Sequence, residues 1–210
     1  MKVLLVNGSP NAQGCTYTAL SEVAGAIESS GIETEMFHIG KGPIQGCVAC
    51  GACREIGKCV FGDAIYNELS EKMVAADGVI IGSPVYFSGP NGALCALLDR
   101  VFYTAAGRFS HKPGACVVSC RRGGASATFD RLNKYFTISQ MPVVSSQYWN
   151  AVHGRNPEEV RRDLEGLQIM RTLGNNMAWL LKCIESGDPP PKPEAKREVT
   201  SFADGKRVDG

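Results

Sequence analysis

The sequence predicts an α/β fold in which an open, doubly wound, five-stranded parallel sheet lies between two layers of helices. Three observations carry this prediction: short, continuously apolar runs, helical stripes between these runs, and one segment that alternates instead. Continuously apolar runs are typical of parallel strands that helices cover on both faces. The runs span residues 3–6, 79–81, 115–118 and 142–144. Strands that alternate with helices in this way indicate crossover connections and a three-layer αβα architecture.

The remaining elements follow from the same patterns. The segment 32–39 is half polar, which is typical of a strand at a sheet edge, and placing it there gives the strand order 2-1-3-4-5. Apolar stripes predict helices over 20–27, 94–102 and 129–136. A last helix is expected from Asn156, a favourable N-cap residue, to about residue 184. In this strand order ligands bind beyond the carboxyl ends of the central strands, so we expect the site in the loops that follow 3–6, 79–81 and 115–118.

The composition limits the classes of protein that the chain can belong to. The 210 residues fit one domain at 1–185, followed by an extended or disordered tail at 186–210 that is rich in proline and charge. The 22 Lys and Arg nearly balance the 21 Asp and Glu, which gives no electrostatic argument for a nucleic-acid or membrane partner. No apolar run approaches the length of a membrane helix, and the first is too short for a secretion signal. An odd number of cysteines, nine, indicates a reducing cytoplasmic environment.

The loop after the first strand, residues 7–18, is rich in small and hydroxyl-bearing residues. Backbone N–H groups at the start of a helix bind phosphate, and hydroxyl groups add donors. The loop contains no Lys or Arg, so dipoles and hydroxyls would do the binding, which suits a monophosphate. A polar turn that only caps the helix is the alternative. The chain contains neither G-x-G-x-x-G nor G-x-x-x-x-G-K-[ST], which argues against a dinucleotide fold or an NTPase.

Two further loops are expected at the same edge of the sheet. In 82–90, Tyr86 and Phe87 stand between two prolines and are suited to pack along a planar aromatic ligand, or else to cap the core. In 119–124, two glycines let the backbone approach a ligand closely. Arg121 or Arg122 would place positive charge beside a bound ring, unless both are ordinary surface arginines.

Three features occur together: the loop Gly8-Ser9-Pro10…Thr16, the segment Gly82-Ser83-Pro84-Val85-Tyr86-Phe87, and the predicted strand order. Together they resemble the flavodoxin-like NADPH-dependent FMN reductase family, over about residues 1–185. The resemblance implies one FMN per chain. It implies phosphate contacts from Ser9, Asn11, Gly14, Cys15, Thr16, Tyr17 and Thr18. It implies ring contacts from Pro84, Val85, Tyr86 and Phe87 on one side, and from Ser119, Cys120, Arg121, Gly123 and Gly124 on the other.

Two of these positions depart from the pattern of the family. Relatives often carry Arg after the Gly-Ser-Pro and Asn before the Thr, whereas Asn11 and Cys15 stand in those places here. Cys15 is also at a helix start, where a thiol pKa can be lowered, although we favour a role in loop packing.

Four cysteines lie within thirteen residues, in the loop 46–60, with the pattern C-x2-C-x2-C-x5-C; they are Cys47, Cys50, Cys53 and Cys59. Three thiolates at this spacing, with a fourth a few residues on, can wrap a compact [4Fe–4S] cubane. Structural zinc sites usually pair two C-x2-C units across a longer gap, so the spacing favours the cluster over zinc. Free thiols or disulfides are a further alternative. The motif makes the chain look most like the iron–sulfur flavoprotein branch of the family.

The other cysteines stand in apolar patterns, which predicts that Cys95, Cys116 and Cys183 are buried, with Cys120 a weak redox candidate near the ring.

These observations predict an FMN-dependent oxidoreductase that receives electrons from NAD(P)H or a ferredoxin and passes them to a small-molecule or protein acceptor. The chemistry would be borne by the flavin, with no catalytic acid or base. Arg121 or Arg122 would tune it, because positive charge near the pyrimidine side of a reduced flavin raises its reduction potential. A non-enzymatic electron carrier and a zinc- or thiol-based regulatory module on the same scaffold are the alternatives. The resemblance further implies a homodimer or homotetramer.

Overall fold

The computed structural model describes residues 1–105 and 107–192. Its strands are β1 (Lys2–Asn7), β2 (Glu33–His38), β3 (Gly78–Tyr86), β4 (Gly89–Pro90), β5 (Gly114–Cys120) and β6 (Ala151–His153). The five longer strands are parallel and run in the order β2-β1-β3-β5-β6, which confirms the predicted order 2-1-3-4-5. The short β4 pairs antiparallel with the end of β3 and was not predicted.

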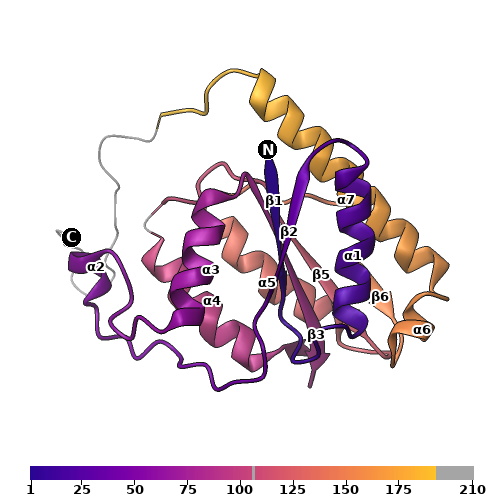
Figure 1. Cartoon of the computed structure of the whole chain (residues 1–210), viewed down its shortest axis with the longest axis horizontal. Helices are drawn as coiled ribbons and strands as arrows, with labels where there is room; N and C mark the ends of the chain where they lie inside the picture. The colour runs from indigo at the N-terminus through magenta and orange to yellow at the C-terminus, as the bar shows by residue number, and fades with distance from the viewer. Residues whose placement is uncertain (106, 193–210) are drawn as a thin grey trace, which may run out of the picture.

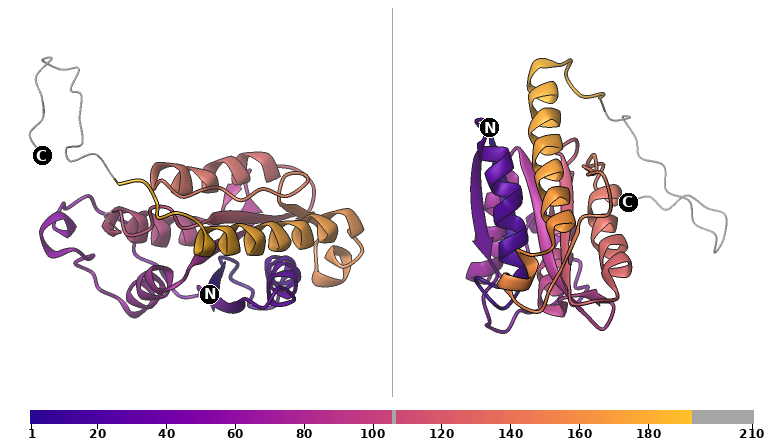
Figure 2. Two further views of the ribbon diagram at one scale, coloured as in Figure 1. Left: turned by 90° about the horizontal axis from the view of Figure 1, so that it is seen from above. Right: turned by 90° about the vertical axis from the view of Figure 1, so that its right-hand side faces the viewer.

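Helices cover both faces of this sheet. They are α1 (Cys15–Glu28), α2 (Cys53–Ile56), α3 (Ala64–Ala75), α4 (Gly92–Thr104), α5 (Ala125–Ile138), α6 (Pro157–Val160) and α7 (Leu164–Ser186). Core residues of α1, α6 and α7 pack on one face and those of α3, α4 and α5 on the other, as Figures 1 and 2 show. The predicted three-layer architecture is confirmed.

The strand β1 shows why the apolar runs are continuous. Leu4 and Val6 belong to the core on the α3–α5 face, whereas Val3 and Leu5 belong to the core on the α1–α7 face. Successive side chains of a strand point to opposite faces, so a strand covered on both faces needs an apolar residue at every position. Each buried aliphatic side chain of this kind contributes about 1.5–3 kcal/mol relative to an exposed one.

The predicted fifth strand is wrong in its position. At 142–144 the chain forms only an isolated bridge between Val143 and Gly114, and β6 lies at 151–153 instead. Pro142 has no N–H to donate to a ladder, and polar residues follow Val144. The three residues of β6 pair with Val118–Cys120, at the carboxyl end of β5.

Three other elements differ from the prediction. The last helix is two helices, α6 and α7, because the Asp163 carboxylate caps α7 by accepting from Gly166 N–H at 2.9 Å. The segment 82–90 is not a simple loop, since β3 continues to Tyr86 and turns back into β4 through Phe87 and Ser88, both with positive φ. The helix α3 was not identified from its own stripe.

The ends of the fold contain one long helix and the predicted tail. At 23 residues α7 is the longest helix described, yet no helix within 1–105 and 107–192 is both long and apolar enough to cross a membrane. The predicted tail begins where α7 ends, and its residues 193–210 lie outside the described residues.

Candidate functional site

The loops after β1 and β3 are locked together at one edge of the sheet. Gly8 N–H donates to the Gly82 carbonyl at 2.9 Å. The side-chain amide of Asn91 donates to the Gly8 carbonyl at 2.7 Å, and Asn91 N–H donates to Ser83 Oγ at 3.0 Å. The predicted meeting of these loops beyond the strand ends is therefore present, with Asn91 as a link that the sequence analysis did not identify.

Two glycines permit the close approach of the loops. A Cβ on Gly8 would lie 2.7 Å from the Gly82 carbonyl oxygen and would collide with the Leu94 side chain. Gly124 has φ +89°, and a Cβ there would lie 2.8 Å from Ser88 Cα. The hairpin β3–β4 and the loop after β5 therefore touch directly at Ser88 and Gly124.

Two of the helices that start at this edge, α1 and α5, begin without a side-chain cap. Among the described helices of eight or more residues, α1 and α5 start after Gly14 and Gly124, with no capping side chain. The other three, α3, α4 and α7, are capped by Asp63, Asn91 and Asp163. The first N–H groups of a helix have no acceptor within the helix. At α1 and α5 these donors are therefore free of side-chain competition and suited to an anionic or carbonyl-bearing ligand.

The predicted phosphate-binding hydroxyls brace the loop in this structure. Ser9 Oγ accepts from Asn11 N–H at 3.1 Å, and Thr18 Oγ1 donates to the Gly14 carbonyl at 3.1 Å. Thr16 Oγ1 and Ser119 Oγ are buried and share a hydrogen bond of 2.8 Å, which brings a predicted phosphate residue and a predicted ring residue together. Backbone N–H groups are thus the donors that the loop offers first.

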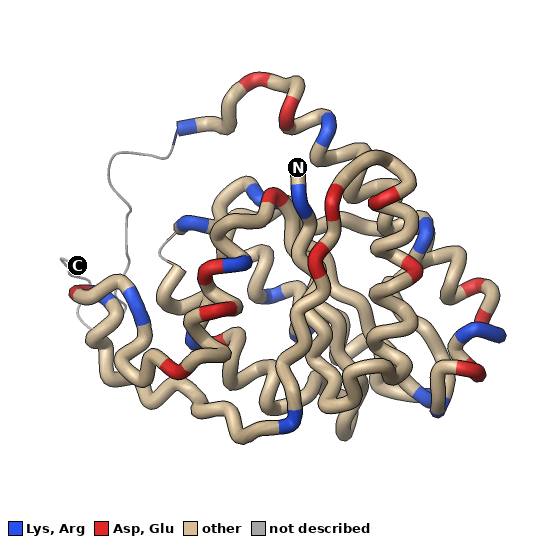
Figure 3. Tube along the Cα trace, viewed as in Figure 1, with Lys and Arg blue, Asp and Glu red and all other residues tan. Residues whose placement is uncertain are grey.

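Two cations that the sequence analysis missed lie beside the same loop. A hollow of about 560 Å³ is lined by residues 10–15 together with His38, Lys41 and Arg155. Lys41 follows β2, so the rule that places ligands beyond the carboxyl ends of parallel strands would have found it, whereas Arg155 follows β6, whose position was not predicted. His38 Nε2 lies 2.8 Å from the Ser9 carbonyl and fixes the loop against β2. Lys and Arg are interspersed with Asp and Glu along the chain (Figure 3). The positive charge available to a ligand at this loop therefore comes from Lys41 and Arg155 themselves.

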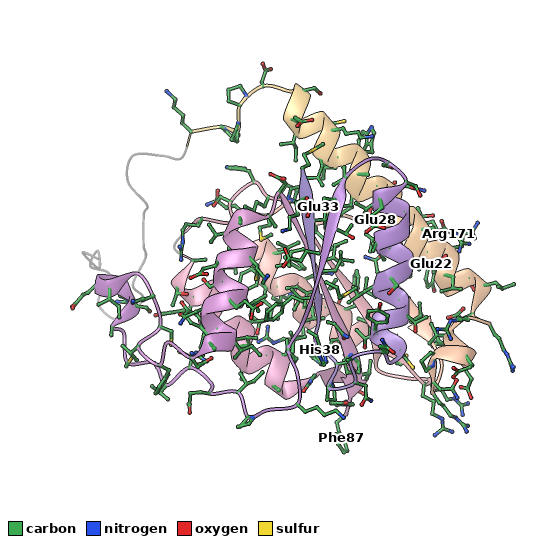
Figure 4. All side chains as sticks on the ribbon, viewed as in Figure 1. Glu22, Glu28, Glu33, His38, Phe87 and Arg171 are labelled. Atoms are coloured by element: carbon green, nitrogen blue, oxygen red, sulfur yellow. The ribbon has the colours of Figure 1, made fainter. Side chains whose placement is uncertain are left out.

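The predicted ring contacts lie on the hairpin and the loop after β5. Pro84 and Val85 are half-buried, whereas Tyr86 is 45% exposed and Phe87 fully exposed. Figure 4 shows Phe87 at the hairpin end, pointing away from the body, so it does not cap the core. Phe87 has a backbone φ of +50°, a conformation that costs a residue other than glycine of the order of 1–3 kcal/mol. Residues strained in this way cluster at functional sites.

The residues that follow β5 lie at the surface. Arg121, Arg122 and Gly123 are exposed. Arg122 lines a second hollow of about 480 Å³ with Trp149 and His153. Tyr148 and Trp149 both face solvent there, with ring centroids 4.8 Å apart.

The two cysteines at this edge are not activated thiols. Burial raises the pKa of Cys15, and burial likewise raises the pKa of Cys120. This agrees with a packing role for Cys15. Of the three cysteines predicted to be buried, Cys116 is buried and Cys95 half-buried, but Cys183 is exposed on α7, so that prediction is wrong for Cys183.

The four clustered cysteines surround one small hollow. Cys47, Cys50, Cys53 and Cys59 all line a space of about 20 Å³, and Arg100 lines it too. Cys47 and Cys50 are exposed, and Cys53 and Cys59 are half-buried. No three metal-binding side chains within the described residues are already gathered at ligand distance. The all-thiol donor set suits an iron–sulfur cluster, but the loop has to open for one to enter.

Comparisons with known proteins agree with this geometry. Residues 1–156 match the family model described as NADPH-dependent FMN reductase. An iron–sulfur flavoprotein of Methanocaldococcus jannaschii is 35% identical over 193 residues, which cover 88% of this chain and 100% of that protein.

Two solved structures share the fold at low sequence identity. RosB with the bound intermediate 8-demethyl-8-formylriboflavin-5′-phosphate has a TM-score of 0.72 and 16% identity, covering 88% of this chain and 80% of its own. A flavodoxin from the domain Archaea has a TM-score of 0.58 and 15% identity, covering 87% and 99%. These likenesses show a flavodoxin-like fold. The family model covers most of the chain, and the matched residues include the loops described above. The chain therefore belongs to the NADPH-dependent FMN reductase family and is an FMN-dependent oxidoreductase.

Proposed function

We propose that this chain binds one FMN where the loops after β1, β3 and β5 meet, and that it transfers electrons from NAD(P)H or a ferredoxin to a small-molecule or protein acceptor. The observation that carries this proposal is the pair of uncapped helix starts, α1 and α5, at one locked edge of the sheet. FMN when bound supplies a ring that accepts and releases electrons, and the protein supplies position and electrostatics.

Residues around the start of α1 hold the phosphate end. Backbone N–H groups of Cys15, Thr16 and Tyr17 donate to the phosphate, because a helix start favours negative charge. Lys41 and Arg155, across the adjacent hollow, supply the positive charge that the loop itself lacks. The ionic contribution is modest and salt-dependent, since Lys41 and Arg155 are exposed.

Residues after β3 and β5 hold the ring. Pro84, Val85, Tyr86 and Phe87 lie on one side, and Ser119, Cys120, Arg121, Gly123 and Gly124 on the other. Positive charge on Arg121 or Arg122 favours the more negative, reduced form of the cofactor and so raises its reduction potential. No side chain acts as a general acid or base in this proposal.

The loop 46–60 holds a [4Fe–4S] cluster through Cys47, Cys50, Cys53 and Cys59. Ala49 and Gly51, which lie between the first three ligands, have φ values of +54° and +76°, so the backbone turns between these cysteines. To admit a cluster, the exposed segment around Cys47 and Cys50 would have to move outward, because the hollow of about 20 Å³ holds little more than one water molecule.

A visible spectrum of protein purified without oxygen tests both cofactors. The proposal expects a yellow flavin spectrum with added broad brown absorbance, and iron and acid-labile sulfide of about four per chain. Zinc without iron or flavin would support the regulatory module instead.

A pair of variants tests the ligand assignment. Cys53→Ala removes one ligand, whereas Cys183→Ala removes an exposed cysteine on α7 that lies outside the motif. Iron content should fall in the first and stay unchanged in the second. Brown absorbance that survives Cys53→Ala refutes the assignment.

Steady-state kinetics identify the electron donor, and hydrodynamic measurements identify the oligomeric state. Steady-state oxidation of NADPH or NADH with a quinone identifies a nicotinamide donor, whereas reduction by ferredoxin alone identifies a protein donor. We further propose a homodimer or homotetramer of the domain 1–185, and a monomer in sedimentation velocity at micromolar concentration contradicts this.

A further inference from the structure

Arg100 of α4 is a buried charge that lies outside the FMN site. Its side chain is 0% exposed, and it lines the same hollow as the four clustered cysteines. Burying a guanidinium is costly unless it is paired and fully hydrogen-bonded. A charge kept in such a place calls for a local explanation.

The hydrogen bonds of Arg100 join both ends of the cysteine loop. Nε donates to Cys59 Sγ at 3.3 Å, and Nη1 donates to the Gln45 carbonyl at 3.1 Å. Nη2 pairs with the Asp63 carboxylate. Gln45 precedes the first cysteine and Asp63 follows the last, so one planar fork holds the start of the loop, its end and one of its sulfurs.

Aromatic side chains fix the guanidinium in this position. Its carbon lies 4.7 Å from the centroid of the Tyr66 ring and 5.8 Å from that of Phe61. The Tyr66 hydroxyl accepts from Cys59 N–H at 3.1 Å and shares a bond of 2.7 Å with Thr104 Oγ1. Cys59 is thus held at both its sulfur and its backbone, whereas Cys47 and Cys50 are exposed.

We propose that Arg100 is a positioning residue for Cys59 and that, through its N–H···S bond and its charge, it raises the midpoint potential of the cluster held by the cysteine loop. This inference rests on the proposed [4Fe–4S] cluster. Hydrogen bonds to ligand sulfurs and the net charge nearby both set the potential of such a cluster. A hydrogen-bond donor to a ligand sulfur and a nearby positive charge both stabilise the reduced, more electron-rich state of the cluster. Asp63 offsets part of that charge, so the two residues act in opposite directions on the potential.

A redox titration of the chain loaded with its cluster, monitored by electron paramagnetic resonance, tests the inference. Arg100→Gln should lower the midpoint potential, and Asp63→Asn should raise it. Arg100→Lys keeps the charge without the fork and should restore part of the loss. Arg171→Gln is the matched control, because Arg171 pairs with Glu22 on the α1–α7 side of the molecule (Figure 4) and its loss should leave the potential unchanged.

Opposite shifts are the result that a purely structural role would not produce. Unchanged potentials in fully loaded Arg100→Gln and Asp63→Asn overturn the inference. If Arg100→Gln does not fold by circular dichroism, Asp63→Asn decides alone, because asparagine preserves the cap that Asp63 gives to α3 through Tyr66 N–H at 3.1 Å. Iron and sulfide analysis of the wild type comes first. A wild type that binds no iron refutes the proposed cluster itself, and this inference falls with it.

Discussion

Replacing Gly8 by alanine tests the close approach on which the proposed FMN site depends. The added Cβ would lie 2.7 Å from the Gly82 carbonyl oxygen and would also collide with the Leu94 side chain. Leu94 is a buried core residue whose side chain can shift, but the Gly82 carbonyl belongs to the central strand β3. The loop after β1 therefore has to move away from β3, which breaks the 2.9 Å bond between Gly8 N–H and Gly82.

Overpacking of this kind costs about 1–3 kcal/mol. A cost of about 2 kcal/mol lowers Tm by roughly 4–8 °C in a domain of this size. FMN should also bind more weakly to Gly8→Ala, because the displaced loop carries the start of α1. Thermal unfolding by circular dichroism and fluorescence titration with FMN measure the two effects.

Gly25→Ala is the matched control. Gly25 is exposed in the interior of α1, and a Cβ there meets nothing within 4 Å. Alanine at such a position stabilises a helix by about 0.5–1 kcal/mol. Leu94→Ala combined with Gly8→Ala should not restore stability, because the carbonyl contact remains. A Gly8→Ala protein as stable as the wild type, with unchanged FMN affinity, refutes the reasoning.

Three further predictions concern the phosphate end, the cysteine loop and the sheet edge. Arg155→Gln should weaken FMN binding by about 3- to 10-fold, with a smaller salt dependence, whereas Arg171→Gln should not; equal affinities remove Arg155 from the site. Tyr66→Phe removes a buried hydroxyl with two partners and should cost about 1–3 kcal/mol in urea unfolding; a loss under 0.5 kcal/mol contradicts the bonds described. Hydrogen bonds from two lysines, on β1 and α3, hold the pKa of Glu35 below its ordinary 4.5. Its contribution to stability is therefore present above about pH 4.5 and is lost as the pH falls through the lower folded value, so Glu35→Gln should flatten the acid limb of the stability profile.

The strand order could be predicted because a strand buried on both faces requires a continuous run of apolar residues in the sequence. The runs 3–6, 79–81 and 115–118 are core strands in the structure, and the half-polar segment 32–39 contains the edge strand β2. The fifth strand could not be predicted in the same way. Its three residues, 151–153, carry no pattern of their own and are held by pairing with the end of β5.

The split of the last helix shows a similar limit. The apolar stripe continues through the break, because Val160 and Leu167 both pack against the same core. The break depends on Asp163, which caps α7 and also accepts from His153 N–H of strand β6 at 2.7 Å. A side-chain bond between a helix start and a neighbouring strand has no period that a sequence can display.

The candidate site likewise contains features that the sequence revealed and features that only the tertiary structure brought together. Local spacing alone identified the cysteine motif and the small-residue loop before α1, since each is contained in one short stretch of chain. Tertiary structure alone brought Arg100 to Cys59, 41 residues away, and set Arg155 beside the loop that lacks cations. Periodicity records which face of an element is buried. Which polar side chains meet is decided by the packing of whole elements, and that is where this protein assembles the charges around its proposed cofactors.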